Sequence, residues 1–350
     1  MKNRIIAAVS LFVLSLNLVV PSLADTKKRA VKKARTNVLV PLLPASDAVI
    51  TMNSGRFLGD SLPKLLAGNQ ALLTRVMDSI SKMQAKTGID LRQFENVATG
   101  ITIRKKSPKE FDFVPVAIAR GQISAPAVIA AAKLAAKGKY REEKIGSRTL
   151  YIFAAKDIAE QHKAKTTDPK KLAMIDRITR KLSAEMAVTA YDANTIVAGT
   201  AGRVRETLGT GPRISPDITQ FLGHGEGTVM EFAARVPEGM KSMLPLENDE
   251  LGRNIDAIRY LYGNFSVAGD GASLRATART LQPTQAQGLY ETLNGLQMLG
   301  KVFLGSAKGA DKQVFHRMVE NVKFAVTGSD VSLELRVPQS DIDVLVGSIK

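Results

Sequence analysis

The stretch FAVTGSDVSLELRVPQSDIDVLVGSI, residues 324–349, contains the pattern that decides the fold. Apolar and polar residues alternate from Val331 to Val337, so valine and leucine lie on one face of this segment and polar residues lie on the other. Such alternation is typical of a strand in an antiparallel sheet that is covered on a single side. A Ser-Asp pair suits the tip of a tight hairpin, and apolar residues recur at helical spacing after Pro338. The stretch therefore predicts two paired strands followed by an amphipathic helix.

Two other segments follow the same plan. They are EMAVTAYDANTIVAGTAGRVRETL (185–208) and FSVAGDGASLRATARTLQPTQAQGLYETL (265–293), and each has an Asp-containing tip between two alternating strands. The helix after the second of these hairpins has an apolar stripe, which we expect to pack onto its own sheet rather than against a partner. The stripe consists of Leu289, Leu293, Leu296 and Leu299.

The chain looks like a duplication of one α+β unit. Glycine and proline cluster in GTGPRISP, 209–216, which predicts a first half over 38–210 and a second half over 211–350. Each half begins with a strand, continues through helices and antiparallel strands, and ends in a helix. We expect helices mainly on one face of each sheet, and the two units should bury their apolar surfaces against each other. A closed barrel is disfavoured because helices recur too regularly between the strands. The expected elements of the first half, before its 185–208 hairpin, are strands at 47–53, 95–104 and 113–120, helices at 61–67, 70–86 and 124–136, and a hairpin at 140–153.

The N-terminus predicts export through the secretory pathway. A positive start (Lys2, Arg4) precedes an apolar run from Ile5 to Val20 and small residues before Asp25, which is the pattern of a signal peptide over residues 1–24, cleaved after Ala24. An uncleaved N-terminal anchor is the alternative. No cysteine follows the run, which excludes a lipid anchor on cysteine. We therefore expect a soluble mature chain in the periplasm or outside the cell.

A basic segment, residues 25–37, follows the leader, and we call it the basic tether. It contains six lysine or arginine residues against one aspartate. These cations could hold the chain near anionic lipid headgroups or other envelope polyanions, or the segment could be a solvated, flexible linker. The candidate binding residues are Lys27, Lys28, Arg29, Lys32, Lys33 and Arg35.

Composition excludes several classes of function. The chain has no cysteine, so it forms no disulfide and offers no thiolate nucleophile or Cys-ligated metal. Aromatic residues make up 5% and tryptophan is absent, which argues against aromatic platforms for sugars or single-stranded nucleic acid. Loss of Lys2 and Arg4 lowers the formal charge from +16 to +14, and the basic tether accounts for a further +5. The body from Val38 onward therefore carries +9.

The phrases LLPASDAVITMNSGRFL (42–58) and KTGIDLRQFENVATGI (86–101) resemble a family of exported bacterial proteins of unknown function. The resemblance covers most of the first half. It implies export and an α+β body, and it transfers no activity and no site.

Candidate reactive residues are few. His224 and Glu226 lie in GHGEG, where they could form an acid–base pair or half of a metal site, or could simply belong to a turn before the next strand. His316 and Glu320 are four residues apart on an expected helix, a spacing much weaker than a two-histidine zinc motif. The segment 162–182 could be a basic amphipathic helix on an anionic surface or a helix that covers its own core. No complete nucleophile elbow or phosphate-binding loop is present.

These observations predict an exported cell-envelope protein that is a non-enzymatic binding or scaffolding module. The expected partner is anionic: an envelope lipid, a glycan or an acidic protein, with peripheral membrane contact possible and no nucleic acid. No catalytic residue, cofactor or metal is assigned, and the sequence leaves the oligomeric state open. The alternative is a hydrolase-type enzyme with a site between the two halves.

Overall fold

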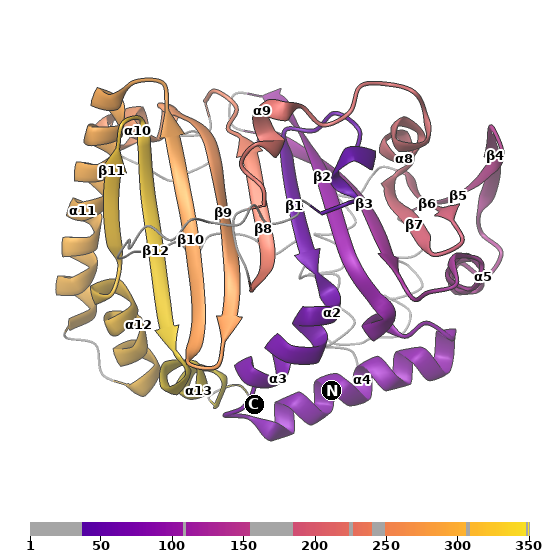
Figure 1. Cartoon of the computed structure of the whole chain (residues 1–350), viewed down its shortest axis with the longest axis horizontal. Helices are drawn as coiled ribbons and strands as arrows, with labels where there is room; N and C mark the ends of the chain where they lie inside the picture. The colour runs from indigo at the N-terminus through magenta and orange to yellow at the C-terminus, as the bar shows by residue number, and fades with distance from the viewer. Residues whose placement is uncertain are drawn as a thin grey trace.

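A computed structural model describes residues 37–107, 110–154, 185–223, 227–239, 249–305, 309–347 and 349. Its centre is an antiparallel sheet of 12 strands in the order β11-β12-β10-β9-β8-β1-β2-β3-β7-β6-β5-β4 (Figure 1). The α+β class expected from the alternating hairpins is confirmed.

The strands are β1 (Ala48–Asn53), β2 (Phe94–Ser107), β3 (Glu110–Gly121), β4 (Arg141–Ile145), β5 (Arg148–Ala154), β6 (Glu185–Asp192), β7 (Thr195–Thr200), β8 (Thr228–Arg235), β9 (Ile258–Ala268), β10 (Gly271–Thr280), β11 (Lys323–Thr327) and β12 (Asp330–Pro338). The helices include α2 (Ser54–Arg56), α3 (Leu62–Leu65), α4 (Gln70–Thr87), α5 (Ala125–Ala135), α8 (Ala201–Leu208), α9 (Pro216–Thr219), α10 (Asp249–Asp256), α11 (Pro283–Gly305), α12 (Ala310–Glu320) and α13 (Gln339–Gly347).

The strand order shows the duplication directly. The first half runs β1-β2-β3-β7-β6 outward from the centre, and the second half runs β8-β9-β10-β12-β11. The hairpin of β4 and β5 is an addition at the outer end of the first half. The halves meet where β1 pairs with β8, with Val49 opposite Ala233. We call this junction the seam.

The seam corrects one expectation. The two units were expected to bury their apolar surfaces against each other, but they lie side by side as parts of one continuous sheet. Backbone hydrogen bonds between two edge strands join them, because pairing removes the open edge that each unit alone would expose. Packing adds to this connection, since Ile214, Ile218 and Phe221 enter a core that also contains Leu39 and Val197.

Local signals place the helix α4 where it was expected. The Asn69 side chain accepts a hydrogen bond from the Leu72 backbone N–H at 2.9 Å, which caps the start of the helix. Gly88 ends it with a φ of 71°, a left-handed conformation that glycine adopts without a steric penalty.

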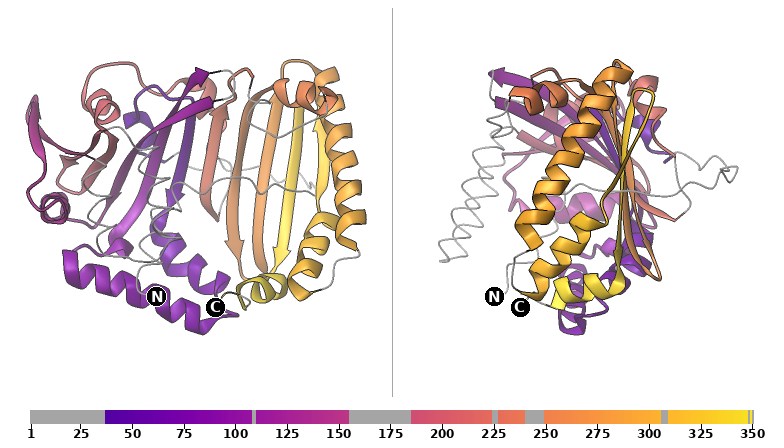
Figure 2. Two further views of the ribbon diagram at one scale, coloured as in Figure 1. Left: turned by 180° about the vertical axis from the view of Figure 1, so that it is seen from behind. Right: turned by 90° about the vertical axis from the view of Figure 1, so that its left-hand side faces the viewer.

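Following the strand register across the sheet identifies its two faces. Ala198 packs against α5 and Ala278 packs against α11, and the register places both alanines on one face. We call this the α5/α11 face (Figure 2). The opposite face, here the α8 face, is apolar in the first half, where α8 and residues 214–222 cover it.

The α8 face becomes polar in the second half. Alternation along β10 and β12 points leucine, valine and alanine toward α11 and points polar side chains the other way, as the sequence predicted. Figure 1 looks onto this part of the sheet, and no described helix lies in front of β10 and β12 there. We call these side chains the polar patch: Tyr262, Asn264, Arg275, Thr277, Arg279, Lys323, Asp330, Ser332, Glu334 and Arg336.

The leucine stripe of α11 only partly behaves as predicted. Leu289 is 2% exposed and packs with Val331, and Leu293 lies beside them. Leu296 and Leu299 are instead 46% and 67% exposed. The expectation that the whole stripe packs on its own sheet is therefore wrong for the second half of the helix. None of the described helices is long and apolar enough to span a bilayer.

Candidate functional site

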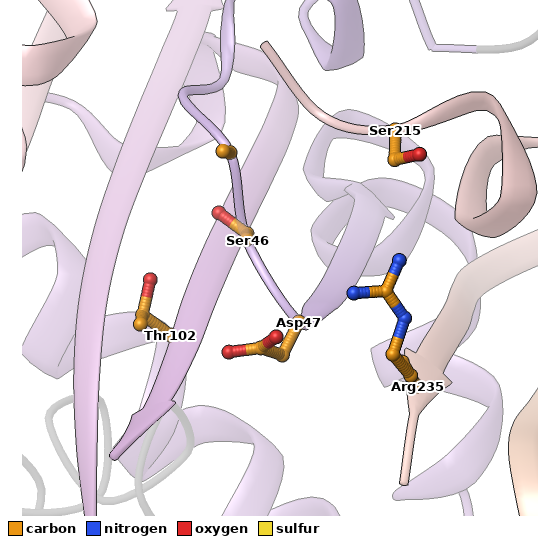
Figure 3. A pocket seen from close by; sticks show the side chains of 6 residues that line it. Ser46, Asp47, Thr102, Ser215 and Arg235 are labelled. Atoms are coloured by element: carbon orange, nitrogen blue, oxygen red, sulfur yellow. The ribbon is translucent and has the colours of Figure 1, made fainter. Parts of the chain in front are cut away.

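A small pocket lies at one end of the seam. It has a volume of about 260 Å³ and is formed by residues from both halves of the chain (Figure 3). Ser46, Asp47 and Thr102 come from the first half, and Ser215 and Arg235 come from the second. We call it the seam pocket.

Asp47 fixes the geometry of the seam pocket. Its backbone N–H donates to the Ile101 carbonyl at 2.9 Å, and its own carbonyl accepts from the Arg235 N–H at 2.7 Å. One carboxylate oxygen, Oδ2, accepts a hydrogen bond from the Ile103 N–H at 2.8 Å. Asp47 is therefore held between β2 and β8, at the point where the two halves join.

Ser46 is held in place by a buried arginine. The Ser46 hydroxyl donates to the Pro44 carbonyl at 2.8 Å and accepts from Nη2 of Arg203 at 2.5 Å. Arg203 comes from α8, its side chain is 4% exposed, and Glu206 is its charged partner. Gly100 makes room for this arrangement, since a Cβ there would lie 2.5 Å from the Ser46 hydroxyl oxygen.

Arg235 forms the opposite wall of the seam pocket. Its Nη2 donates to Oδ2 of Asp217 at 2.6 Å, and the Tyr260 hydroxyl donates to the same oxygen at 2.8 Å. Burial alone would raise the pKa of Asp217, but hydrogen bonds from Ser215, Arg235 and Tyr260 outweigh it and lower the pKa to about 2. The Asp217 carboxylate in turn raises the pKa of Arg235.

The seam pocket is suited to hydrogen bonding rather than to bond-breaking chemistry. Among its lining residues there is one carboxylate, and no histidine pairs with it as an acid or base. The Ser46 hydroxyl already donates its proton to a backbone carbonyl, so it is not activated as a nucleophile. The Thr102 hydroxyl is buried and has no hydrogen-bond partner among the described atoms.

Most of the site residues expected from the sequence are not among the residues that the structure describes. The cations of the basic tether (Lys27 to Arg35), the pair His224 and Glu226, and the segment 162–182 all lie outside the described residues. His316 and Glu320 do meet on α12, with 3.5 Å between Nδ1 and Oε2. In the described part of the chain no three metal-ligating side chains come together.

No sequence motif predicts the seam pocket. Asp47 appears in the sequence only as the start of a strand, and Ser215 only as a residue before a helix-starting proline. They are separated by more than 160 positions, so no motif spacing connects them.

Comparisons with known proteins identify structural neighbours but no family. No family model matches the chain, and no curated protein matches it. Solved structures similar to it include crystal forms IV, III and I of TP0453, at 10%, 11% and 13% identity and TM-scores of 0.43, 0.41 and 0.39. The alignments cover 90%, 88% and 91% of this chain and 97%, 97% and 99% of the neighbours. At TM-scores below 0.5 the likeness does not establish a common fold, and no activity follows from it.

Proposed function

We propose that this protein is exported to the cell envelope and acts there as a non-enzymatic binding module for an anionic partner. The observation that carries the proposal is the arrangement of charge on the polar patch, where the carboxylates lie below the arginines. The Glu334 side chain is 8% exposed, whereas those of Arg275 and Arg336 are 56% and 71% exposed.

A second ion pair in the polar patch has the same orientation. Arg279 binds Asp330 through two hydrogen bonds of 2.6 Å, and the arginine side chain is 39% exposed against 24% for the aspartate. Lys323 stands opposite Glu334 on the edge strand β11 and is exposed. The surface presented to solvent is therefore cationic, although acidic residues balance part of its charge. Such a surface attracts polyanions and orients them by hydrogen bonds from guanidinium groups.

Export rests on the N-terminal pattern. The leader over residues 1–24 and the absence of cysteine fit an envelope protein that needs no disulfide. The basic tether would then add six cations next to the folded body.

The alternative of a hydrolase is less well supported. The seam pocket does lie between the halves, where such a site was expected, but Asp47 is its one lining carboxylate and the Ser46 hydroxyl is already engaged. Binding of a small polar group is the simpler role for this pocket.

The test measures binding of the chain without residues 1–24 to a soluble polyanion, heparin, at low ionic strength. The double variant Arg336→Gln with Lys323→Gln removes two exposed cations and leaves the 2.8 Å pair of Arg275 and Glu334 intact. We expect affinity to fall by ~10-fold or more, because each cation near an anionic surface contributes about 1 kcal/mol.

The matched control removes two exposed cations from the first half, Arg56→Gln with Arg104→Gln. This control should change affinity by less than about threefold. Equal losses in both double variants would show that net charge alone matters and would refute a specific role for the polar patch. Deleting residues 25–36 separately measures the contribution of the basic tether.

A further inference from the structure

The second half of α11 presents an apolar surface to solvent. Met298, Val302 and Phe303 are 69%, 72% and 81% exposed, and Leu296 and Leu299 continue the same surface. Phe315 of the neighbouring helix α12 is 47% exposed. We call these six residues the α11 patch. Clustered exposure of large apolar side chains is uncommon on isolated soluble proteins and marks contact sites.

The α11 patch cannot turn inward, because the inner side of the helix is already engaged. Ala286 and Leu289 are 0% and 2% exposed and pack on the sheet. Further along, the Gln297 side chain donates to the carbonyls of Val319 and Val322 at 2.8 and 2.6 Å, which fixes the rotation of α11 against α12. The apolar side chains on the outer side are therefore held in solvent.

The charge pattern of α11 selects the occupant. After Glu291 the helix carries a single charged residue, the partly exposed Lys301, and no acidic residue, whereas the neighbouring helix α12 carries exposed Lys312 together with exposed Asp311 and Glu320. A surface of projecting apolar side chains with lysine nearby has the chemistry by which peripheral helices bind anionic lipid, with the apolar groups among the acyl chains and the cations at the headgroups.

The shape of the surface agrees with this occupant. Figure 2 shows α11 standing along the outer end of the sheet, with α12 beside it. A side chain that is 81% exposed projects from the molecule and does not line a groove. A fluid bilayer adapts to projecting side chains, whereas a folded protein partner needs a matching concave surface.

We infer that the α11 patch docks this protein on the surface of an anionic lipid bilayer. The inference rests on the proposed function and names the lipid surface among the anionic partners. The polar patch lies on the α8 face and α11 covers the opposite face, so the two surfaces can be tested separately.

The test is flotation of the chain without residues 1–24 with vesicles of phosphatidylcholine containing phosphatidylglycerol. Val302→Ser with Phe303→Ser should lower the fraction bound at least ~10-fold, because burial of these side chains is lost. Binding of the unaltered chain should partly survive in about 0.5 M NaCl, since the apolar contribution is not screened.

The control replaces two other exposed apolar residues, Leu134→Ser with Leu281→Ser, which are 72% and 63% exposed. This control should bind vesicles as the unaltered chain does, and thermal unfolding of both double variants confirms that they are folded. Unchanged flotation of the Val302 and Phe303 variant would overturn the inference.

Two further outcomes are distinguishable. If sedimentation shows a dimer that the Val302 and Phe303 variant converts to a monomer, the occupant is a second copy of the chain and the lipid inference fails. If that variant floats normally while Arg336→Gln with Lys323→Gln loses heparin binding, the inference fails and the proposed function stands. If the Val302 and Phe303 variant loses flotation while Arg336→Gln with Lys323→Gln keeps heparin binding, the lipid inference stands and the proposed role of the polar patch fails.

Discussion

Asp217 shows at the scale of single residues how this protein uses charge at the seam. Its carboxylate accepts hydrogen bonds from Arg235 and Tyr260 on one oxygen. The pKa is lowered from 3.8 to about 2 in the folded protein. The stabilisation is therefore fully present above pH 3.8 and is lost as the pH falls from 3.8 through about 2.

Asp217→Asn removes this stabilisation. We expect the free energy of unfolding at pH 7 to fall by about 1–2 kcal/mol, a range reduced from the full shift because the side chains of both partners are partly solvent-exposed. Urea unfolding at pH 7 and across the acid range measures it, and the difference from the unaltered chain should shrink below pH 3.8. Asp60→Asn, at an exposed position, is the control and should change stability by less than about 0.5 kcal/mol. If the difference in the free energy of unfolding between Asp217→Asn and the unaltered chain stays constant below pH 3.8, the ionised Asp217 carboxylate is not the source of the stabilisation.

The residues of the seam pocket could not be predicted from the sequence. Asp47, Thr102 and Arg235 become neighbours because three strands pair in one order, and pairing order depends on contacts between distant segments. The burial of Arg203 could not be predicted either. Its position in the sequence suggests an exposed helical residue, yet its side chain is 4% exposed.

At the scale of elements, β9 and β10 pair so closely at one point that only glycine fits. A Cβ on Gly263 would lie 2.0 Å from the Arg275 carbonyl oxygen and 2.8 Å from the Phe232 ring. The strands themselves were predictable from their alternation, but this close approach was not, because it depends on the partner strand.

Gly263→Ala should therefore force the two strands apart. We expect a loss of about 1–3 kcal/mol in the free energy of unfolding. Gly202→Ala on α8 is the matched control, since nothing lies within 4 Å of its added Cβ. That control should stabilise the protein by about 0.5–1 kcal/mol because alanine favours a helix. Urea unfolding measures the free energy of unfolding of both variants, which should fall for Gly263→Ala and rise for Gly202→Ala. If the two substitutions change stability equally, the close approach of β9 and β10 is contradicted.

At the scale of the whole molecule, we expect the seam to make the two halves unfold as one cooperative unit. Val49 and Ala233 face each other across β1 and β8, and both are 0% exposed. Residues 214–222 strengthen this connection by packing into the core of the first half. Separating the halves would expose both the paired edges and this apolar surface.

Val49→Ala should accordingly lower the stability of both halves. We expect a loss of about 2 kcal/mol from the buried methyl groups. Native-state hydrogen exchange should show equal decreases in protection for amides of β7 in the first half and β12 in the second. Leu289→Ala, in the second half, should also affect both strands. Unchanged protection of β12 in the Val49 variant would show that the halves unfold separately.

The sequence by itself determined the α+β class, the repeated hairpin and helix, and which side chains of β10 and β12 face the helices. These properties are local, because a period of two and a glycine or asparagine at a helix end act within a few residues of chain. Only the tertiary structure decided how the halves join, where the seam pocket lies and which leucines of α11 stay exposed. Those properties depend on strand pairing and on the rotation of α11 against α12, which are set by contacts between residues far apart in the chain.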